Sequence, residues 1–345
     1  MITGGRPRWV HPPLEPGWID RPHERLSIGD LPLESGETIL DCEISYVVHG
    51  TINAARDNVV LGLTAIGSTH HRLDDLIGPA RPLDPARYCT IVVDAIGNGL
   101  STSPSNSQKQ SDLAFPRFGL RDMVESQRRL LDALGIGGLA AVVGASMGGM
   151  QALQWGVSHP RRVGRLVAIV PMARTRSWSI AMNEAARRAL MADSAWPSGP
   201  MTVGLDAWAA LTRVITNRSP QALEAWPAGE VVGRVGDICA AARLTGPDPV
   251  DWYYQSLAYD AHDVGTTSGF GGDTAAALRS IVAPTLLVVP GLDLYNPVED
   301  AIEAATLIND CTLARFDRPA GHAIAAVGSA AAAEIRDVVA RHLAR

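Results

Sequence analysis

Five short apolar runs constrain the fold of this chain more than any other feature of its sequence. They occupy residues 58–63 (NVVLGL), 89–94 (CTIVVD), 139–144 (LAAVVG), 165–170 (RLVAIV) and 284–289 (PTLLVV). Runs of this length, without alternation of polar and apolar residues, are typical of strands buried on both faces of a mostly parallel sheet. Helical patterns separate the runs and supply the crossovers that parallel strands need. We therefore expect an α/β fold with a mostly parallel central sheet and flanking helices.

The two ends of the chain complete this expected layout. In the stretch LDCEISYVVHG, Ile44, Tyr46 and Val48 alternate with polar or small neighbours, which indicates antiparallel leading strands. The last 18 residues have the pattern of an amphipathic helix. Its expected apolar side carries Ile335, Val338, Val339 and Leu343.

The strand pattern stops in the middle of the chain and helical patterns rich in Ala, Arg and Trp replace it. We expect residues 174–278 to form a helical cap inserted into a core made of residues 1–173 and 279–345. A cap in this position would cover the carboxyl edge of the sheet, where open α/β sheets bind their ligands. A length of 345 residues suits one such domain with an insertion.

Charge and composition exclude several classes of protein. A net charge of −6 without a basic run argues against a nucleic-acid partner. The four cysteines form no CxxC pair and have no histidine at ligand spacing, so we expect neither a disulfide framework nor a metal site. We also expect no cofactor. The start of the chain has no apolar leader region and no run reaches the length of a membrane helix, so we expect a cytoplasmic protein without membrane contact.

The sequence VVGASMGGMQ contains the pentapeptide Gly144-Ala145-Ser146-Met147-Gly148, which matches the pattern G-x-S-x-G. An expected strand ends immediately before it and a helical pattern follows, which is the context in which this pattern holds a nucleophile. Small neighbours permit the strained turn that lifts the serine hydroxyl above the sheet. We interpret Ser146 as the nucleophile, and a serine in a merely structural turn is the alternative.

A serine needs a base and an acid, which in this kind of fold follow in the order serine, acid, histidine. His322, in DRPAGHAIAAVG, lies on a loop between a final expected strand and the closing helix. Asp293, in LLVVPGLDLYNPVED, directly follows the expected strand at 284–289. Asp300 is better explained by helix capping or surface solvation, and Asp263 falls in the expected cap.

The negative oxygen of a tetrahedral intermediate needs two fixed donors. One would be the amide of Met147, directly after the nucleophile. The loop LGLTAIGSTHH follows an early strand, so the Ile66 amide is the best second donor, with Gly67 beside it.

Taken together, these stretches resemble the homoserine O-acetyltransferase family of α/β-hydrolases. The resemblance extends from YVVHGTINAARDNVVL through LIGPARPLDPARYCTIVVDAIGNGLSTSPSN, DMVESQRRLLDALGI and GASMGGMQALQWGVSHPRRV to DLYNPVED and GHA. It implies an α/β-hydrolase fold with a cap and a catalytic triad at Ser146, Asp293 and His322.

The family contains acetyltransferases that use acetyl-CoA and also simple carboxylesterases. In the transferases the catalytic histidine is typically followed by an aspartate, which looks like the group that binds the homoserine amine. This chain has Ala323 at that position. Arg187, in NEAARRALMAD, resembles the transferases' carboxylate binder. The stretches PLDPARY and GNGLSTSPSN look more like the ester-hydrolysing branch, and TAIGS replaces the transferases' HALTG. We therefore expect Gly67, Arg187 and Ala323 to contact the substrate.

The resemblance thus favours a serine carboxylesterase acting on small, short-chain acyl esters. Homoserine O-acetyl transfer, or a related O-acyl transfer from acetyl-CoA, is the alternative within the family. A non-catalytic scaffold is a third reading, although such a scaffold would usually have lost a member of the triad. The same triad also hydrolyses amides. A homodimer formed through the cap is an open alternative to a monomer.

Overall fold

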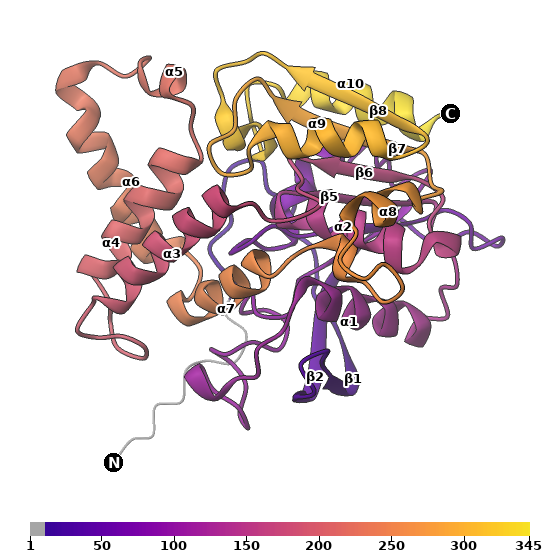
Figure 1. Ribbon diagram of the computed structural model, residues 1–345, viewed down its shortest axis with the longest axis horizontal. Helices are drawn as coiled ribbons and strands as arrows, with labels where there is room; N and C mark the ends of the chain where they lie inside the picture. Colours follow the sequence, from indigo (N-terminus) through magenta and orange to yellow (C-terminus); the bar gives the residue numbers. More distant parts are fainter. Residues whose placement is uncertain (1–10) are drawn as a thin grey trace.

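The computed structural model describes residues 11–345, and residues 1–10 of the expected core range lie outside the described residues. Eight strands form one sheet in the order β1-β2-β4-β3-β5-β6-β7-β8 (Figure 1). The strands are β1 (Glu24–Pro32), β2 (Thr38–His49), β3 (Val59–Leu63), β4 (Cys89–Val93), β5 (Ala141–Ala145), β6 (Leu166–Ile169), β7 (Thr285–Pro290) and β8 (Cys311–Phe316).

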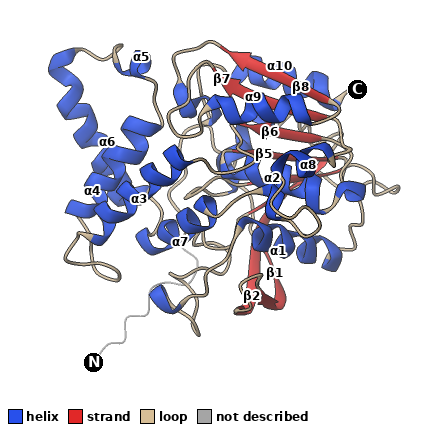
Figure 2. Ribbon diagram, viewed as in Figure 1, coloured by secondary structure: helices blue, strands red, loops and turns tan. Residues whose placement is uncertain are grey.

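The sheet is mostly parallel, as the apolar runs predict. The five runs correspond to β3, β4, β5, β6 and β7. All pairs from β4 to β8 in the strand order, namely β4 with β3, β3 with β5, β5 with β6, β6 with β7 and β7 with β8, are parallel. Only β1 with β2 and β2 with β4 pair in antiparallel fashion. All residues of β3 to β7 are buried because helices cover both faces of the sheet (Figure 2). The predicted α/β fold is confirmed.

Successive residues of each central strand point to opposite faces of the sheet and join two separate cores. In β3, Val59 and Leu61 pack in the core beneath α1 (Leu120–Ala133) and α2 (Met147–Ser158). Val60 packs instead in the core beneath α10 (Ala332–Leu343). The closing helix buries Ile335, Val339 and Leu343 there, with Val338 partly buried against the same core, as its pattern predicts.

The second strand differs from its predicted half-buried alternation. Ile44 and Tyr46 are buried as expected, but Ser45, Val47 and His49 between and after them are buried too. The cause is that both faces of β2 are covered. Ile44 and Tyr46 pack in the core beneath α1 and α2, whereas Val47 packs in the core beneath α10.

Ten α-helices are found in residues 11–345. In addition to α1, α2 and α10, they are α3 (Ser177–Met191), α4 (Val203–Ala209), α5 (Pro220–Leu223), α6 (Val231–Thr245), α7 (Pro249–Asp260), α8 (Thr274–Arg279) and α9 (Val298–Leu307). Residues 170–284, between β6 and β7, contain α3 to α8 and no strand.

The helices between β6 and β7 fall into two groups. Side chains of α3, α4 and α6 form a separate hydrophobic cluster, which includes Leu190, Leu205 and Trp208. Figure 1 shows these helices grouped to one side of the sheet. Helix α7 contacts both regions: Trp252 joins this cluster, whereas Tyr254 and Tyr259 join the main core, although α7 lies within the residues 174–278 that we expect to form the cap. No helix within residues 11–345 combines the length and apolar character required to span a bilayer.

Candidate active site

Three loops at the carboxyl ends of neighbouring strands bring the predicted reactive residues together. Ser146 lies between β5 and α2, and Asp293 follows β7. His322 lies on the short 3₁₀ helix η7 (Gly321–Ala325), which follows β8. Because β5, β6, β7 and β8 are consecutive parallel strands, their carboxyl ends meet at one edge of the sheet.

Ser146 occupies a strained backbone position at the turn from strand to helix. Its φ of 56° and ψ of −122° are values that residues with a side chain rarely adopt. The turn is tight enough to require glycine on both sides. A Cβ on Gly144 would lie 2.1 Å from the carbonyl oxygen of Gly148, and one on Gly148 would lie 2.3 Å from that of Leu63.

A continuous chain of hydrogen bonds connects the three predicted residues. The His322 Nε2 atom lies 2.8 Å from the Ser146 Oγ atom, and the His322 Nδ1 atom lies 2.7 Å from the Asp293 Oδ2 atom. Each of the three residues is at most 4% exposed. The carboxylate holds the ring hydrogen on Nδ1, which leaves Nε2 to accept the serine proton.

A set of polar groups that sequence reasoning did not identify holds Asp293 in place. The backbone amides of Tyr295 and Asn296 donate to its Oδ1 atom at 2.7 and 2.9 Å. The Asn296 side chain donates to the Val170 carbonyl and accepts from the Tyr259 hydroxyl. The stretch DLYNPVED contains Tyr295 and Asn296, but its residue types alone do not reveal these contacts.

The two other acids weighed for this role lie elsewhere. Asp300 is only 4% exposed, so the expected surface solvation is wrong. It accepts from the Ala173 amide at 2.6 Å and pairs with Arg176 at 2.8 Å. Asp263 accepts from the Gly265 amide at 2.7 Å. Both carboxylates therefore stabilise local structure.

The two predicted oxyanion donors lie in two different segments, the Met147 amide directly after the serine and the Ile66 amide after β3. Met147 is the first residue of α2, so its amide has no acceptor in the preceding turn of the helix. In the loop after β3, the Gly67 amide donates to the Gln255 side chain at 2.8 Å and the Ser68 amide donates to the Ala65 carbonyl. The Ile66 amide has no hydrogen-bond partner among the described residues, and it lies in the wall of the cavity that contains Ser146.

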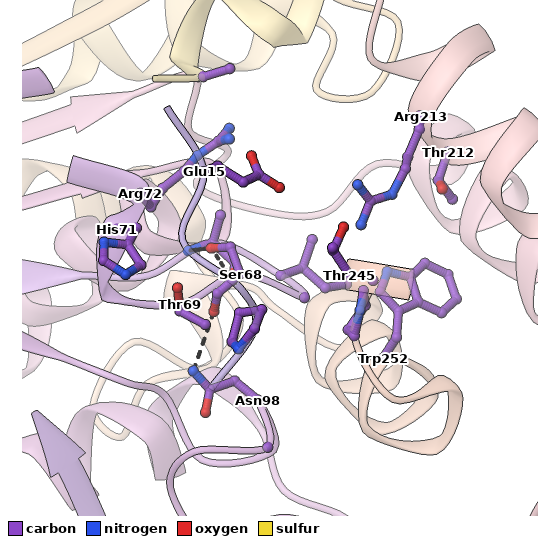
Figure 3. Close-up of a pocket in the computed structure, with 18 of the residues that line it drawn as sticks. Glu15, Ser68, Thr69, His71, Arg72, Asn98, Thr212, Arg213, Thr245 and Trp252 are labelled. Carbon is purple, nitrogen blue, oxygen red and sulfur yellow. Dashed lines mark hydrogen bonds between the residues drawn. The ribbon is translucent and has the colours of Figure 1, made fainter. Parts of the chain in front are cut away.

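A cavity of about 760 Å³ opens onto Ser146 and His322. Its wall combines the loops of the sheet, helices from the segment between β6 and β7, and the first described residues of the chain. Figure 3 shows Arg72 and Glu15 on one side of it and Arg213 and Thr212 on the other. The residues that also line it include His11, Trp18, Gly67, His71, Trp208, Arg218, Trp252, Tyr295 and Ala323.

The three predicted substrate contacts differ in their positions. Gly67 and Ala323 line the cavity, but Arg187 does not. The guanidinium of Arg187 pairs with Asp260 at 2.7 Å and Glu184 at 3.0 Å, and it donates to the Ser256 hydroxyl. A buried guanidinium with these partners is already satisfied within the protein.

Comparison with known proteins identifies the class of protein and then the family. A model of the alpha/beta hydrolase fold matches residues 63–210. The chain is 32% identical to the ethyl acetate hydrolase of Pseudomonas veronii, over 83% of this chain and 85% of that protein. It is 30% identical to the homoserine O-acetyltransferase of Chlorobium chlorochromatii, over 84% of this chain and 87% of that protein. The chain therefore belongs to the homoserine O-acetyltransferase family of α/β-hydrolases.

Other relatives match over a shorter length. The homoserine O-succinyltransferase of Methylibium petroleiphilum is 39% identical over 49% of this chain, and the match spans 48% of that relative. Among solved structures, the acetyl esterase MekB superposes with a TM-score of 0.87 at 30% identity, covering 94% of this chain and 97% of that one. An acetylester hydrolase from Corynebacterium glutamicum also superposes with a TM-score of 0.87, at 28% identity, covering 94% of this chain and 96% of that one. The chain thus spans about half the length of some of the relatives it matches, and the family includes proteins named as esterases and proteins named as acyltransferases.

Proposed function

We propose that this protein is a serine carboxylesterase that hydrolyses small, short-chain acyl esters through an acyl-serine intermediate. The observation that carries this proposal is the hydrogen-bond chain from Asp293 through His322 to Ser146, which ends at the cavity. A serine hydroxyl becomes nucleophilic when an oriented imidazole accepts its proton. In this arrangement the catalytic residues are Ser146 and His322, and Asp293 fixes the imidazole tautomer.

The chemistry proceeds in two halves. Ser146 attacks the ester carbonyl while His322 accepts its proton, and the amides of Met147 and Ile66 hold the negative oxygen. His322 then returns the proton to the departing alcohol. Water attacks the acyl-serine in the second half, with His322 again as base. Each oxyanion donor in such a site contributes about 10²–10³-fold to kcat.

Two features of the site favour water over an amino-acid acceptor. Ala323, next to His322, offers no carboxylate for an ammonium group, and Arg187 is occupied by Asp260 and Glu184. Loss of one charge-assisted hydrogen bond costs about 1.5–3 kcal/mol, or roughly 10- to 150-fold in acceptor binding. Water needs no such anchor. The similarity to an ethyl acetate hydrolase over 83% of this chain, and to an acetyl esterase over 94%, supports the same assignment.

One observation favours the acyltransferase alternative. Arg72 and Arg213 line the cavity, and neither forms an ion pair with a described carboxylate. Burial lowers the pKa of Arg72 to about 10, which still leaves the guanidinium charged at neutral pH. Such groups suit a carboxylate or phosphate on an acyl donor or acceptor.

Product analysis separates the two reactions. We expect the purified protein to release acid from p-nitrophenyl acetate at a rate that millimolar L-homoserine barely changes, and to make little O-acetylhomoserine from acetyl-CoA. Ala323→Asp should raise transfer relative to hydrolysis, because it adds a carboxylate beside His322. Ala326→Asp, at a second position in the cavity wall, is the matched control. O-acetylhomoserine as the main product of the wild-type protein would contradict the esterase assignment.

A further inference from the structure

Four histidines from three separate segments lie close together, and two of them, His11 and His71, line the cavity. The proposed chemistry uses none of the four. They are His11, His23 and the adjacent pair His70 and His71, which begins the 3₁₀ helix η1 (His70–Leu76). The ring centroids of His70 and His71 are 4.1 Å apart, and that of His11 lies 5.4 and 5.0 Å from them. Figure 3 shows His71 on the side of the cavity that carries Arg72 and Glu15.

Each member of the adjacent pair has its own buried carboxylate. His70 Nδ1 lies 3.3 Å from Asp94 Oδ2, and His71 Nδ1 lies 2.7 Å from Asp74 Oδ2. A carboxylate that faces Nδ1 keeps the ring hydrogen on that atom, so Nε2 retains its lone pair. Histidines that bind metals are oriented in this way by a carboxylate on the opposite ring nitrogen.

The third imidazole completes a set of ligand atoms. His11 Nε2 lies 3.1 Å from His71 Nε2. One ligand nitrogen from each of His11, His70 and His71 lies within 4.8 Å of the other two. Zinc–nitrogen bonds of about 2.0–2.1 Å place tetrahedral ligands about 3.3 Å apart, so one pair is already at this spacing. The third nitrogen is within reach of a small side-chain movement.

Burial of His11 favours its neutral imidazole, which is the form that binds a metal. Burial, and then the neighbouring His70 and His71, lower the pKa of His11. Burial also lowers the pKa of His23 to about 4, despite the attraction of Asp94.

A second group, His23 with His70 and Asp94, also has suitable ligand types. However, Asp94 Oδ2 already accepts from the Ser45 hydroxyl at 3.0 Å, in addition to its contact with His70. Its Oδ1 accepts from the His70 amide and the Asn98 side chain. A metal there would displace these donors, so Asp94 is better suited to orienting His70.

We propose that His11, His70 and His71 bind one divalent cation of the zinc class, with Asp74 and Asp94 as orienting carboxylates and water as a fourth ligand. Through His11, the ion would link the segment at residues 11–18, which contributes to the cavity wall, to His70 and His71 of η1. Since η1 starts four residues after Ile66, the ion would also stabilise the loop that presents the Ile66 amide. The sequence offers no sign of this site, because His11 lies 60 residues from His71 in the chain.

The test uses protein stripped with a chelator and then titrated with Zn²⁺ against a chromophoric competitor. We expect one ion per chain with a dissociation constant of about 1 µM or below, a rise in Tm, and, with Co²⁺, the intense visible bands of four-coordinate geometry. His11→Ala and His71→Ala should each weaken binding at least about 10-fold, and Asp74→Asn about 10- to 100-fold. His159→Ala, at the far end of α2, is the control and should bind as the wild type does.

His11 lies near the start of the chain, so His11→Ala should fold, and circular dichroism of the metal-free variant verifies this. Ser146→Ala protein should bind Zn²⁺ normally, which separates this result from any failure of the proposed esterase function. Binding weaker than about 100 µM would overturn the proposal. So would normal binding by His11→Ala together with loss of binding in His23→Ala, because that result assigns the ion to the second group.

Discussion

Ser146 combines an unfavourable backbone conformation with the hydroxyl on which the proposed chemistry depends. The positive φ is maintained because the strand before it and the helix after it fix the chain on both sides. Alanine carries the same Cβ as serine, so Ser146→Ala leaves this backbone strain unchanged. This replacement can test chemistry with little effect on the fold.

Ser146→Ala should abolish ester hydrolysis, with a loss on the order of 10⁶-fold in kcat, while Tm stays near that of the wild type. The physical reason is that the acyl-serine can no longer form, whereas almost no volume changes. Initial rates with p-nitrophenyl acetate measure the effect. Ser111→Ala, at an exposed serine, is the matched control. Activity of Ser146→Ala within tenfold of the wild type would contradict the assigned nucleophile.

Asp293→Asn should lower kcat by about 10⁴-fold. The amide oxygen of asparagine can still accept from the amides of Tyr295 and Asn296, but its NH₂ group would face His322 Nδ1. The imidazole would then carry its hydrogen on Nε2 and could not accept the serine proton. Asp300→Asn should instead lower Tm and leave kcat nearly unchanged. If the two variants exchanged these effects, Asp300 would be the acid.

At the scale of elements, sequence patterns predict the strands better than they predict the partners of the helices. The runs without alternation identify β3 to β7 because both sheet faces are covered in this fold. The same reasoning fails for β2, where alternation suggests one exposed face but both faces pack against a core. Asp300 is another example, because its burial depends on Ala173 and Arg176, more than 120 residues away.

Gly148→Ala should lower the free energy of unfolding by about 3 kcal/mol or more, the upper end of overpacking costs. The new methyl group would meet the Leu63 carbonyl at 2.3 Å, and backbone atoms of a central strand cannot move aside easily. Thermal or urea unfolding measures the change. Gly236→Ala, on exposed α6 with no atom within 4 Å of the added carbon, should stabilise the protein by about 1 kcal/mol. Equal stability of Gly148→Ala and the wild type would show that the turn is looser than described.

At the scale of the whole molecule, the sequence predicts the order and position of Ser146, Asp293 and His322 because each follows a recognisable strand. It does not predict which distant groups neutralise one another. Arg187 has the residue type and position of a substrate contact, yet Asp260 from α7 pairs with it. The histidine cluster was missed for the same reason, since His11 and His71 meet only in the folded chain.

We expect the protein to form a homodimer through α3 to α6. Most of the large apolar side chains that are exposed in residues 11–345 lie on this part of the chain, which is the distribution expected of an association surface. They are Trp178, Ile180, Met191, Val203, Ile215, Val231, Val232 and Leu244.

Val203→Glu and Val232→Glu should each convert the dimer to a monomer, because a buried unpaired carboxylate opposes association. Light scattering coupled to size-exclusion chromatography measures the mass. Val282→Glu is the control, since Val282 is 67% exposed but lies outside α3 to α6. A wild-type monomer at every protein concentration tested would contradict this arrangement.

The strands β6 and β7 are neighbours in the sheet, paired from Leu166 with Thr285 onward, although more than a hundred residues separate them in the chain. The intervening segment therefore starts at the end of one strand and ends at the start of the neighbouring strand. Insertions and deletions within it need not alter the register of any strand. Selection can remodel this segment, and with it much of the cavity wall, while the loops that carry Ser146, Asp293 and His322 stay unchanged. Such an arrangement allows the cavity wall to change between related proteins while Ser146, Asp293 and His322 keep their positions.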